Sequence, residues 1–565
     1  IIDIGGQDMK CFKIRNGAVD SIMLNEACSS GCGSFIETFA KALGYDIASF
    51  AKLGLFTQKP VNLGSRCTVF MNSSVKQAQK DGASVEDISA GLSISIVKNA
   101  IYKVIRAASA DDLGRHIVVQ GGTFHNDAVL RAFEQELGRD VTRPAIAGIM
   151  GAFGAALAAR DLRLERSAIL DAKALEAFSH TAKPVTCSLC TNHCSLTVNS
   201  FDGGRRFISG NRCSRPLGKE KAELPDLYRY KYQRLRAMEG RGNGDGSRGR
   251  IGIPFGLNMY ENLPFWYDLF TRLNFEVVLS PESSRKLYIK GQRTIPSDTV
   301  CYPAKLLHGH VQALVELGVD AIFYPCMSYN FNEKISDNNY NCPVVAYYPE
   351  LLAANMPDLK KTRFLNPYAG LHRPKDYERI GSQWFADTFG VPRREAASAI
   401  RSAYGAYAQY QEDVRRTAGE YVREAGERGL PVIVLAGRPY HIDPEINHGI
   451  NDLITSFGFV VVSEDAVACL EDYAPRKVLN QWTFQARMYN AARYVCEQPD
   501  MQLVQLVSFG CGTDAITGDE VRSILEEGGK LYTQLKIDDI SNLGAVKIRV
   551  RSLMAAMEER KRHDD

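Results

Sequence analysis

Ten of the fourteen cysteines in this 565-residue chain lie in settings that suit metal binding. They are Cys28, Cys67, Cys187, Cys190, Cys194, Cys213, Cys301, Cys326, Cys342 and Cys511. Grouped cysteines in a chain without export signals more often bind metal or do redox chemistry than form disulfides. Cys11, Cys469 and Cys496 have no companions and are interpreted as core thiols.

The first pair of cysteines precedes helical segments. Cys28 lies in a Gly/Ser-rich turn just before a predicted helix, and Cys67 precedes a second helical stretch. A helix N-terminus carries partial positive charge and free N–H groups, which stabilise a thiolate-bound, anionic cluster. Buried structural thiols are the alternative. Cys32, in the same turn as Cys28, either adds a ligand or is a bystander.

A second group of cysteines has the spacing of a metal knuckle. Cys187, Cys190 and Cys194 form a Cys-x₂-Cys-x₃-Cys run, and Cys213 follows after eighteen intervening residues. Such spacing lets neighbouring thiolates reach one centre from a tight turn. A [4Fe–4S] cluster and a Cys₄ zinc site, with His193 as an alternative ligand, both fit.

Four more cysteines lie beside Pro or Gly at or near predicted strand ends: Cys301, Cys326, Cys342 and Cys511. Ligands bind at strand ends in open α/β sheets, so these thiols could ligate a further, larger cluster. Turn-packing thiols are the alternative. The polar turn holding Arg438, His441 and Asp443 suits an anionic substrate, a group near the cluster, or a salt-bridged turn.

Two glycine turns, about 115 residues apart, suit nucleotide phosphates. Asp3-Ile-Gly5-Gly6-Gln7-Asp8 is a strand followed by a tight turn, where Gly admits phosphate oxygens and Asp orients Mg²⁺ or water. Gly121–Gly122 follows a second predicted strand. Each turn alone could be a plain hairpin or strand–helix connection.

The elements that position these residues alternate between strand and helix, which predicts an α/β protein. We expect a nucleotide-binding domain over 1–165, a Cys-rich module over 185–240, Rossmann-like α/β domains over 250–375 and 431–550, and a helical segment over 376–430. Strands are predicted near 275–279, 321–324, 344–348 and 432–436.

Residues 1–160 resemble the activators of 2-hydroxyacyl-CoA dehydratases and their benzoyl-CoA reductase-type relatives, on the Cys28 turn and on Cys67-Thr-Val-Phe. The resemblance implies a partial actin/hexokinase/Hsp70-like ATPase domain, closed by a small-residue helix over 148–156. It also implies a [4Fe–4S] cluster that Cys28 and Cys67 of two subunits share across a two-fold axis. Catalytic Asp3, Gln7 and Asp8, with Gly5 and Gly6, would hold the phosphates and Mg²⁺ of ATP, and Gly121 and Gly122 would flank adenosine. The family's first phosphate loop is expected before residue 1.

The second half resembles the region that follows the activase in long fused proteins and, more distantly, dehydratase and double-cubane cluster subunits. We therefore predict an ATP-dependent reductive activator, fed by a ferredoxin or flavodoxin. It would act on an acyl-CoA dehydratase or reductase, or on its own C-terminal cluster. A self-contained reductase of a small molecule and a zinc-stabilised scaffold are the alternatives. A net charge of +3 and the lack of an eighteen-residue apolar run argue against nucleic-acid and membrane partners. Low-potential, exposed clusters would be sensitive to oxygen, so we expect an anaerobe's cytoplasm.

Overall fold

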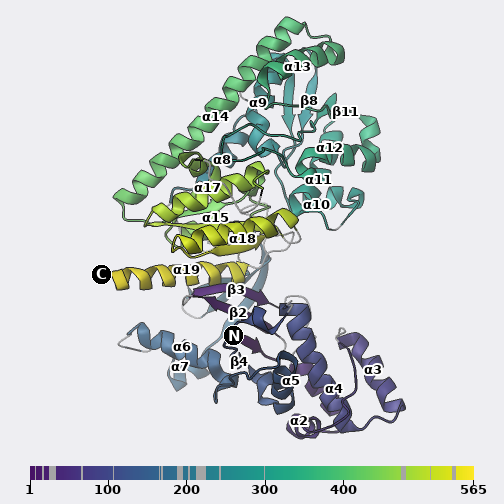
Figure 1. Ribbon diagram of the computed structural model, residues 1–565, viewed down its shortest axis with the longest axis vertical. Helices are drawn as coiled ribbons and strands as arrows, with labels where there is room; N and C mark the ends of the chain where they lie inside the picture. Colours follow the sequence, from purple (N-terminus) through teal and green to yellow (C-terminus); the bar gives the residue numbers. More distant parts are fainter. Residues whose placement is uncertain are drawn as a thin grey trace. The chain divides into compact units, whose positions relative to one another are not determined.

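The computed structural model contains two compact units, each described here by itself (Figure 1). Unit 1 comprises Ile1–Ala177 with Arg551–Asp565, and unit 2 comprises Phe178–Val550. The structure describes residues 1–6, 8–15, 18–24, 33–64, 68–105, 107, 109–163, 166, 169–187, 195–201, 204–210, 224–240, 244–297, 299–472, 479–508, 511–537 and 543–564.

Unit 1 is built on a four-stranded sheet in the order β3-β2-β1-β4. The strands are β1 (Ile2–Ile4), β2 (Met9–Arg15), β3 (Ala18–Leu24) and β4 (Val119–Gln120). β1 pairs antiparallel with β2 and parallel with β4, so segments more than a hundred residues apart lie side by side. The two predicted glycine turns therefore follow adjacent strands.

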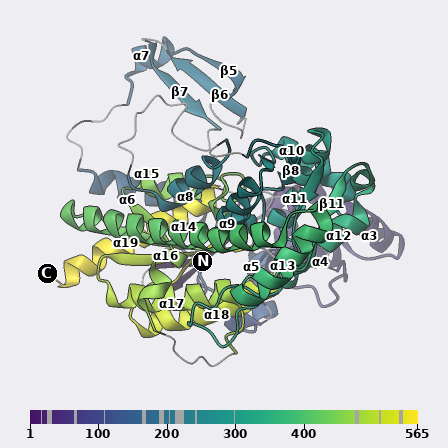
Figure 2. The same cartoon turned by 90° about the horizontal axis from the view of Figure 1, so that it is seen from above.

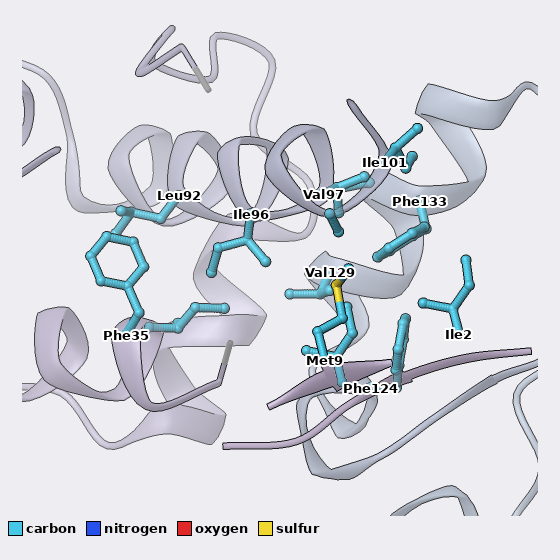
Figure 3. Packing of buried hydrophobic residues seen from close by; sticks show 14 of the residues in the cluster. Ile2, Met9, Phe35, Leu92, Ile96, Val97, Ile101, Phe124, Val129 and Phe133 are labelled. Atoms are coloured by element: carbon cyan, nitrogen blue, oxygen red, sulfur yellow. The ribbon is translucent and has the colours of Figure 1, made fainter. Parts of the chain in front are cut away.

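Seven helices of the described chain belong to unit 1. They are α1 (Gly33–Ala42), α2 (Ile47–Gly54), α3 (Thr68–Lys80), α4 (Val85–Lys98), α5 (Asp127–Leu137), α6 (Met150–Asp161) and α7 (Ala172–Glu176). Asn126 caps α5 by accepting from the backbone N–H groups of Ala128 and Val129, and Gly138 ends it in the left-handed conformation. Side chains from α1, α4 and α5 pack on the sheet in one core (Figure 3).

Helix α4 continues into a π-helical turn, Asn99–Ile105. The run Val85–Ile105 is long and apolar enough to cross a membrane by length and composition, with a mean hydropathy of 1.3. However, 72% of it is buried inside the protein, where Leu92 and Ile96 pack in the core of unit 1 (Figure 3). A buried core helix accounts for this run.

Unit 2 begins with a small antiparallel sheet of β5 (His180–Thr186), β6 (Ser195–Phe201) and β7 (Arg206–Ser209), which Figure 2 shows side by side. Helix α8 (Leu227–Arg236) follows. Sequence patterning did not predict these three strands, because β5 is exposed along its whole length and shows no apolar alternation.

The first lobe of unit 2 is a parallel sheet in the order β11-β10-β8-β9. Its strands are β8 (Arg250–Ile253), β9 (Glu276–Leu279), β10 (Ala321–Phe323) and β11 (Arg363–Leu365). The helices are α9 (Met259–Arg272), α10 (Arg285–Gly291), α11 (Tyr302–Glu316), α12 (Pro343–Asn355) and α13 (Pro374–Phe389). The prediction of an α/β fold with parallel strands is confirmed here.

One predicted strand of this lobe is wrong. Residues 344–348 belong to helix α12, and β11 is the strand that the pattern missed. Val344 and Val345 are β-branched and favour a strand. Pro343 instead occupies the first position of a helix, where its fixed φ suits the helix and its missing N–H has no cost.

The second lobe is a parallel sheet in the order β13-β12-β14-β15. Its strands are β12 (Val432–Ala436), β13 (Val460–Ser463), β14 (Met501–Ser508) and β15 (Thr533–Ile537). Its helices are α15 (Ile450–Ser456), α16 (Glu464–Val467), α17 (Thr483–Glu497), α18 (Gly512–Glu527) and α19 (Leu543–Asp564). The last residues of α19, from Arg551, belong to unit 1. Every residue of β12 is buried, as both faces of a parallel sheet require.

The 35-residue helix α14 (Arg393–Glu427) spans both lobes (Figures 1 and 2). It packs against α9 and α13 of the first lobe and against β13 and α16 of the second. Its buried face includes Ile400 and Val414. Helix α14 therefore holds the two lobes as one body.

Candidate functional site

The two glycine turns of unit 1 meet. Gln120 on β4 donates from Nε2 to Asp3 Oδ2 on β1 at 2.8 Å. Gly121 has a φ of +97°, and a Cβ there would lie 2.3 Å from the carbonyl oxygen of Ile4. Only glycine allows this approach of the two turns.

A cavity of about 330 Å³ opens beside these turns. Its volume falls in the range of small-ligand and cofactor sites. The backbone N–H groups of Gly33 and Ser34 donate to Gly5 O and Gly6 O, so the start of α1 is fixed against the first turn. The residues lining the cavity are Gly6, Gly33, Ser34, Ile36, Glu37, Ile47, Ala48, Ala51, Gly122, Thr123, His125 and Asn126.

Several predicted site residues lie outside the described part of the chain. These are Gln7, Cys28, Cys32, Cys67, Cys190, Cys194 and Cys213. Helix α1 begins one residue after Cys32 in the sequence, and α3 begins one residue after Cys67. Cys187 is described: it is buried and packs with Leu196 and Ile208. Metal binding at these positions stays a prediction.

Three cysteines of unit 2 each begin a helix. Cys301 is the N-cap of α11, Cys342 of α12 and Cys511 of α18. The Cys342 thiol accepts a hydrogen bond from the backbone N–H of Val345, 3.4 Å away. Three helix N-termini thus bring partial positive charge to three thiols.

In each lobe, the site residues follow the carboxyl ends of the parallel strands, where α/β folds bind ligands. In the first lobe strand order reverses between β8 and β10, and Asn258 after β8 donates to Met327 Sδ after β10 at 3.4 Å. In the second lobe it reverses between β12 and β14, where Arg438 and Cys511 follow. Such reversal points form crevices at the carboxyl ends of strands.

The thiols from the two lobes lie within electrostatic reach of one another. The pKa of Cys301 is raised to about 12, mainly by burial; Cys342 and Cys511 add to the shift, and Arg438 opposes it. Burial also raises the pKa of Cys342, where Arg438 again opposes and Cys511 adds to the shift. Without added positive charge these thiols stay protonated, whereas a bound metal centre would stabilise their thiolates.

Arg438 is the charged group of this site. Its guanidinium contacts Cys511 Sγ at 3.4 Å and Thr513 Oγ1 at 3.2 Å, and it is ion-paired with Asp514. The side chains of Arg438 and Asp514 are each only 4% exposed. The predicted salt-bridged turn therefore describes Arg438, and its predicted position near a cluster stays a prediction.

Cys326 has different surroundings. It follows β10, and its backbone pairs with Pro367 and Ala369. The pKa of its thiol is raised to about 11, mainly by burial, and the nearby carboxylate of Glu350 contributes to the shift. Cys301, Cys342 and Cys511 share Arg438 as a neighbour, whereas the charged neighbour of Cys326 is Glu350.

One other predicted side chain, Asp443, connects the two lobes. Asp443 accepts from Tyr260 and Ser283 of the first lobe, and His310 Nε2 lies 3.0 Å from Ser283 Oγ. His308 lies 2.8 Å from Thr294 Oγ1 through Nδ1 and 3.1 Å from Tyr348 through Nε2. Because both nitrogens of His308 are hydrogen-bonded within the protein, we assign it a packing role.

Sequence reasoning missed two tyrosines beside the thiols. The pKa of Tyr440, on the second lobe, is raised by burial and by Cys301 and Cys342, and Arg438 opposes the shift. Tyr324, on the first lobe, is fully buried near Cys326, Cys342 and Cys301. Each adjoins a motif singled out in the sequence, but no spacing rule assigns a function to a lone Tyr.

Among the described residues, no three His, Cys, Asp or Glu side chains lie close enough to hold a single metal ion. A multi-atom cluster separates its thiolates further than a single ion does. The donor set of three thiols, three helix N-termini and one arginine is chemically compatible with an iron–sulfur cluster.

Two family models match the chain. Residues 1–159 match the BadF/BadG/BcrA/BcrD ATPase family, and residues 250–467 match the CoA enzyme activase uncharacterised domain. The first match supports the predicted ATPase domain, and both confirm the resemblance of the chain to activases.

Curated relatives match the first unit. The 2-hydroxyisocaproyl-CoA dehydratase activator of Clostridioides difficile is 35% identical over 162 residues, covering 28% of this chain and 59% of the relative. The (R)-2-hydroxyglutaryl-CoA dehydratase activating ATPase of Acidaminococcus fermentans is 35% identical over 157 residues, with the same coverage. This chain thus spans about three fifths of the length of these relatives.

A solved structure matches the same region. It is the Clostridium difficile activator of 2-hydroxyisocaproyl-CoA dehydratase with bound ADPNP, 32% identical, covering 30% of this chain and 63% of that chain. The TM-score is 0.26, at which superposition alone does not establish a shared fold.

Proposed function

We propose that this chain, which joins an N-terminal domain of the BadF/BadG/BcrA/BcrD ATPase family to a CoA enzyme activase domain, is an ATP-dependent iron–sulfur electron-transfer protein. Electrons enter at a [4Fe–4S] cluster that Cys28 and Cys67 share across a homodimer. They pass to a second centre in unit 2 or to a separate acyl-CoA dehydratase or reductase. The relatives are named as dehydratase activators, which supports a separate acyl-CoA dehydratase or reductase as the acceptor.

The convergence of Cys301, Cys342 and Cys511 at facing strand ends of two lobes carries the proposal. Cys342 and Cys511 come from different lobes, yet each lies close enough to Cys301 to raise its pKa. A cluster at this position would supply one-electron chemistry when bound. The protein would contribute the helix N-termini that stabilise the thiolates and the Arg438 guanidinium that offsets their charge.

In unit 1 we assign the cavity of about 330 Å³ to ATP with Mg²⁺. Asp3 and Asp8, with Gln7, would orient Mg²⁺ and the attacking water, and Gly5 and Gly6 would admit the phosphates. Gly121 and Gly122 would flank adenosine. The hydrogen bond from Gln120 supports this role for Asp3, because it fixes the carboxylate beside the first turn.

A reductase that needs no separate acceptor protein is the second candidate function. It is favoured by the position of the three thiols at crevices where parallel α/β sheets bind their ligands. In this case unit 1 would reduce the centre in unit 2, and a small molecule would be reduced there. For both functions we propose an anaerobe's cytoplasm and a ferredoxin or flavodoxin as the electron donor.

The test is iron and sulfide quantitation on the full chain purified anaerobically, for Cys301→Ser, Cys342→Ser and Cys511→Ser. We expect each variant to lose the same share of the iron. Cys326→Ser is the nearby control, and Cys469→Ser, an exposed thiol, is the remote control. Both should retain wild-type iron. Unchanged iron in all three site variants, or zinc in place of iron, contradicts the proposal.

The shared cluster has a separate test. Cys28→Ser and Cys67→Ser should each lower the iron content and shift the protein from dimer to monomer, measured by light scattering after anaerobic size exclusion. Cys11→Ser is the control, because Cys11 is a buried core thiol on β2. A dimer that persists without this iron would show that the interface does not depend on the cluster.

A further inference from the structure

The hydroxyl group of Tyr324 is an unsatisfied donor inside the first lobe. The residue directly follows β10 and has no exposed surface. Its hydroxyl has no hydrogen-bond partner among the residues that the structure describes. Leaving a buried hydroxyl unpaired is unfavourable, so such a group in a folded protein indicates a ligand or bound water.

The surroundings of this hydroxyl indicate which ligand it faces. Burial raises the pKa of Tyr324, and Tyr348 and the thiols of Cys326, Cys342 and Cys301 are the ionisable groups whose charges add to that shift. Tyr348 is already engaged with His308 Nε2, 3.1 Å away. The thiols of Cys342 and Cys301 are those that we assign to the metal centre of unit 2.

We propose that the Tyr324 hydroxyl donates a hydrogen bond to a sulfur atom of the metal centre held by Cys301, Cys342 and Cys511. This inference rests on the proposed function. Arg438 of the second lobe already contacts Cys511 Sγ at 3.4 Å, so the centre receives one donor from each lobe.

The hydrogen bond has a predictable effect on the centre. A donor to a cluster sulfur stabilises the reduced, more negative state and raises the reduction potential. Tyr324→Phe removes only the hydroxyl and keeps the ring in its packed position. We expect the iron content to be unchanged and the midpoint potential to become more negative.

Tyr228→Phe is the matched control. Tyr228 is also buried, but its hydroxyl donates to the Leu435 carbonyl at 2.9 Å, and its charged neighbours are carboxylates. The midpoint potential of the metal centre in Tyr228→Phe should stay at the wild-type value. In the metal-free protein we expect the opposite ranking for stability: Tyr228→Phe should be the more destabilising variant. Only Tyr228→Phe removes a donor from a buried carbonyl group. Its thermal midpoint should fall, whereas that of Tyr324→Phe should stay equal or rise.

The experiment is an anaerobic redox titration of the full chain, following the signal that Cys511→Ser abolishes. A more negative midpoint in Tyr324→Phe, with wild-type iron and sulfide, supports the inference. An unshifted midpoint overturns it, and so does loss of iron, which would make Tyr324 a ligand rather than a donor. A wild-type chain without iron that depends on Cys511 overturns the proposed function as well.

Discussion

Arg438 and Asp514 form a buried ion pair in the second lobe. The pair lies where Cys511 is the N-cap of helix α18. Asp514 also accepts from the backbone N–H of Ser508 at 2.8 Å. The pair therefore connects the turn after β12 to the turn after β14, the two segments at the reversal of strand order in the second lobe. It places the guanidinium against the Cys511 thiol.

Removing one partner of this pair should destabilise the protein strongly. Arg438→Met leaves the Asp514 carboxylate buried without a counter-charge, which costs roughly 3–5 kcal/mol. Arg438→Met/Asp514→Asn removes both charges and keeps an acceptor for Ser508, so it should recover most of that loss. Urea unfolding of the metal-free protein measures both. Equal stabilities of the single and double variants would contradict the buried-charge explanation.

Gly121 and Gly122 should differ in their tolerance of a side chain. Gly121→Ala forces alanine to a φ of +97° and places its Cβ 2.3 Å from Ile4 O, whereas Gly122→Ala meets no atom within 4 Å. The strain at Gly121 costs about 1–3 kcal/mol, and the clash adds to it. We expect Gly121→Ala to lower the thermal midpoint and to abolish nucleotide binding, measured by calorimetry. If Gly121→Ala and Gly122→Ala had equal thermal midpoints, the close approach of the turns would be wrong.

The parts of the fold that the sequence predicts are those with strong local signals. Strand β12 matches the predicted 432–436, because five consecutive apolar residues are typical of a central parallel strand. Helix α5 also carries a strong local signal, because a capping Asn126 precedes a run with apolar periodicity. The strand predicted over 344–348 is wrong because the two valines favour a strand more strongly than the sequence pattern allows for Pro343. Pro343 favours a helix only because it stands at the first helical position.

The site in unit 2 was only partly predictable. Each cysteine could be placed at a strand end or a helix start from its neighbours in the sequence. However, spacing cannot separate Cys326 from Cys342, since both follow β10 within twenty residues. The grouping of Cys511 with Cys301 depends on how the two lobes face each other, which α14 and the Asp443 contacts determine. No local pattern contains that information.

Acid should destabilise unit 2 through buried neutral histidines. Burial lowers the pKa of His308 to about 4 and of His310 to about 3, and it lowers the pKa of His441 as well. Below pH 6.5 the unfolded chain binds protons that the folded chain does not, so stability falls as the pH drops from about 6.5 toward 4. Each histidine contributes up to about 1.4 kcal/mol per pH unit.

The pH dependence can be assigned with one substitution. His310→Asn keeps polar atoms near Ser280 and Ser283 but removes one titrating group. The slope of stability against pH, from urea unfolding at pH 4 to 7, should fall by up to about 1.4 kcal/mol per pH unit, the contribution of one such histidine. Other titrating groups contribute equally to the slopes of wild type and variant, so their contributions cancel in the difference between the two slopes. An unchanged slope would mean that His310 is not held neutral by burial.

The cavity of unit 1 can be filled without disturbing the fold. Glu37 and Thr38 are adjacent, exposed residues of α1, and only Glu37 lines the cavity. Glu37→Trp should therefore weaken ATP binding at least tenfold, because the indole occupies volume that the nucleotide needs. The lost Glu37–Lys41 pair is exposed and contributes little to stability. Thr38→Trp adds the same side chain outside the cavity and should bind ATP as wild type does. Calorimetric titration of both variants, with thermal midpoints to show equal folding, makes the comparison. Equal ATP affinity in the two variants would place the nucleotide elsewhere in the chain.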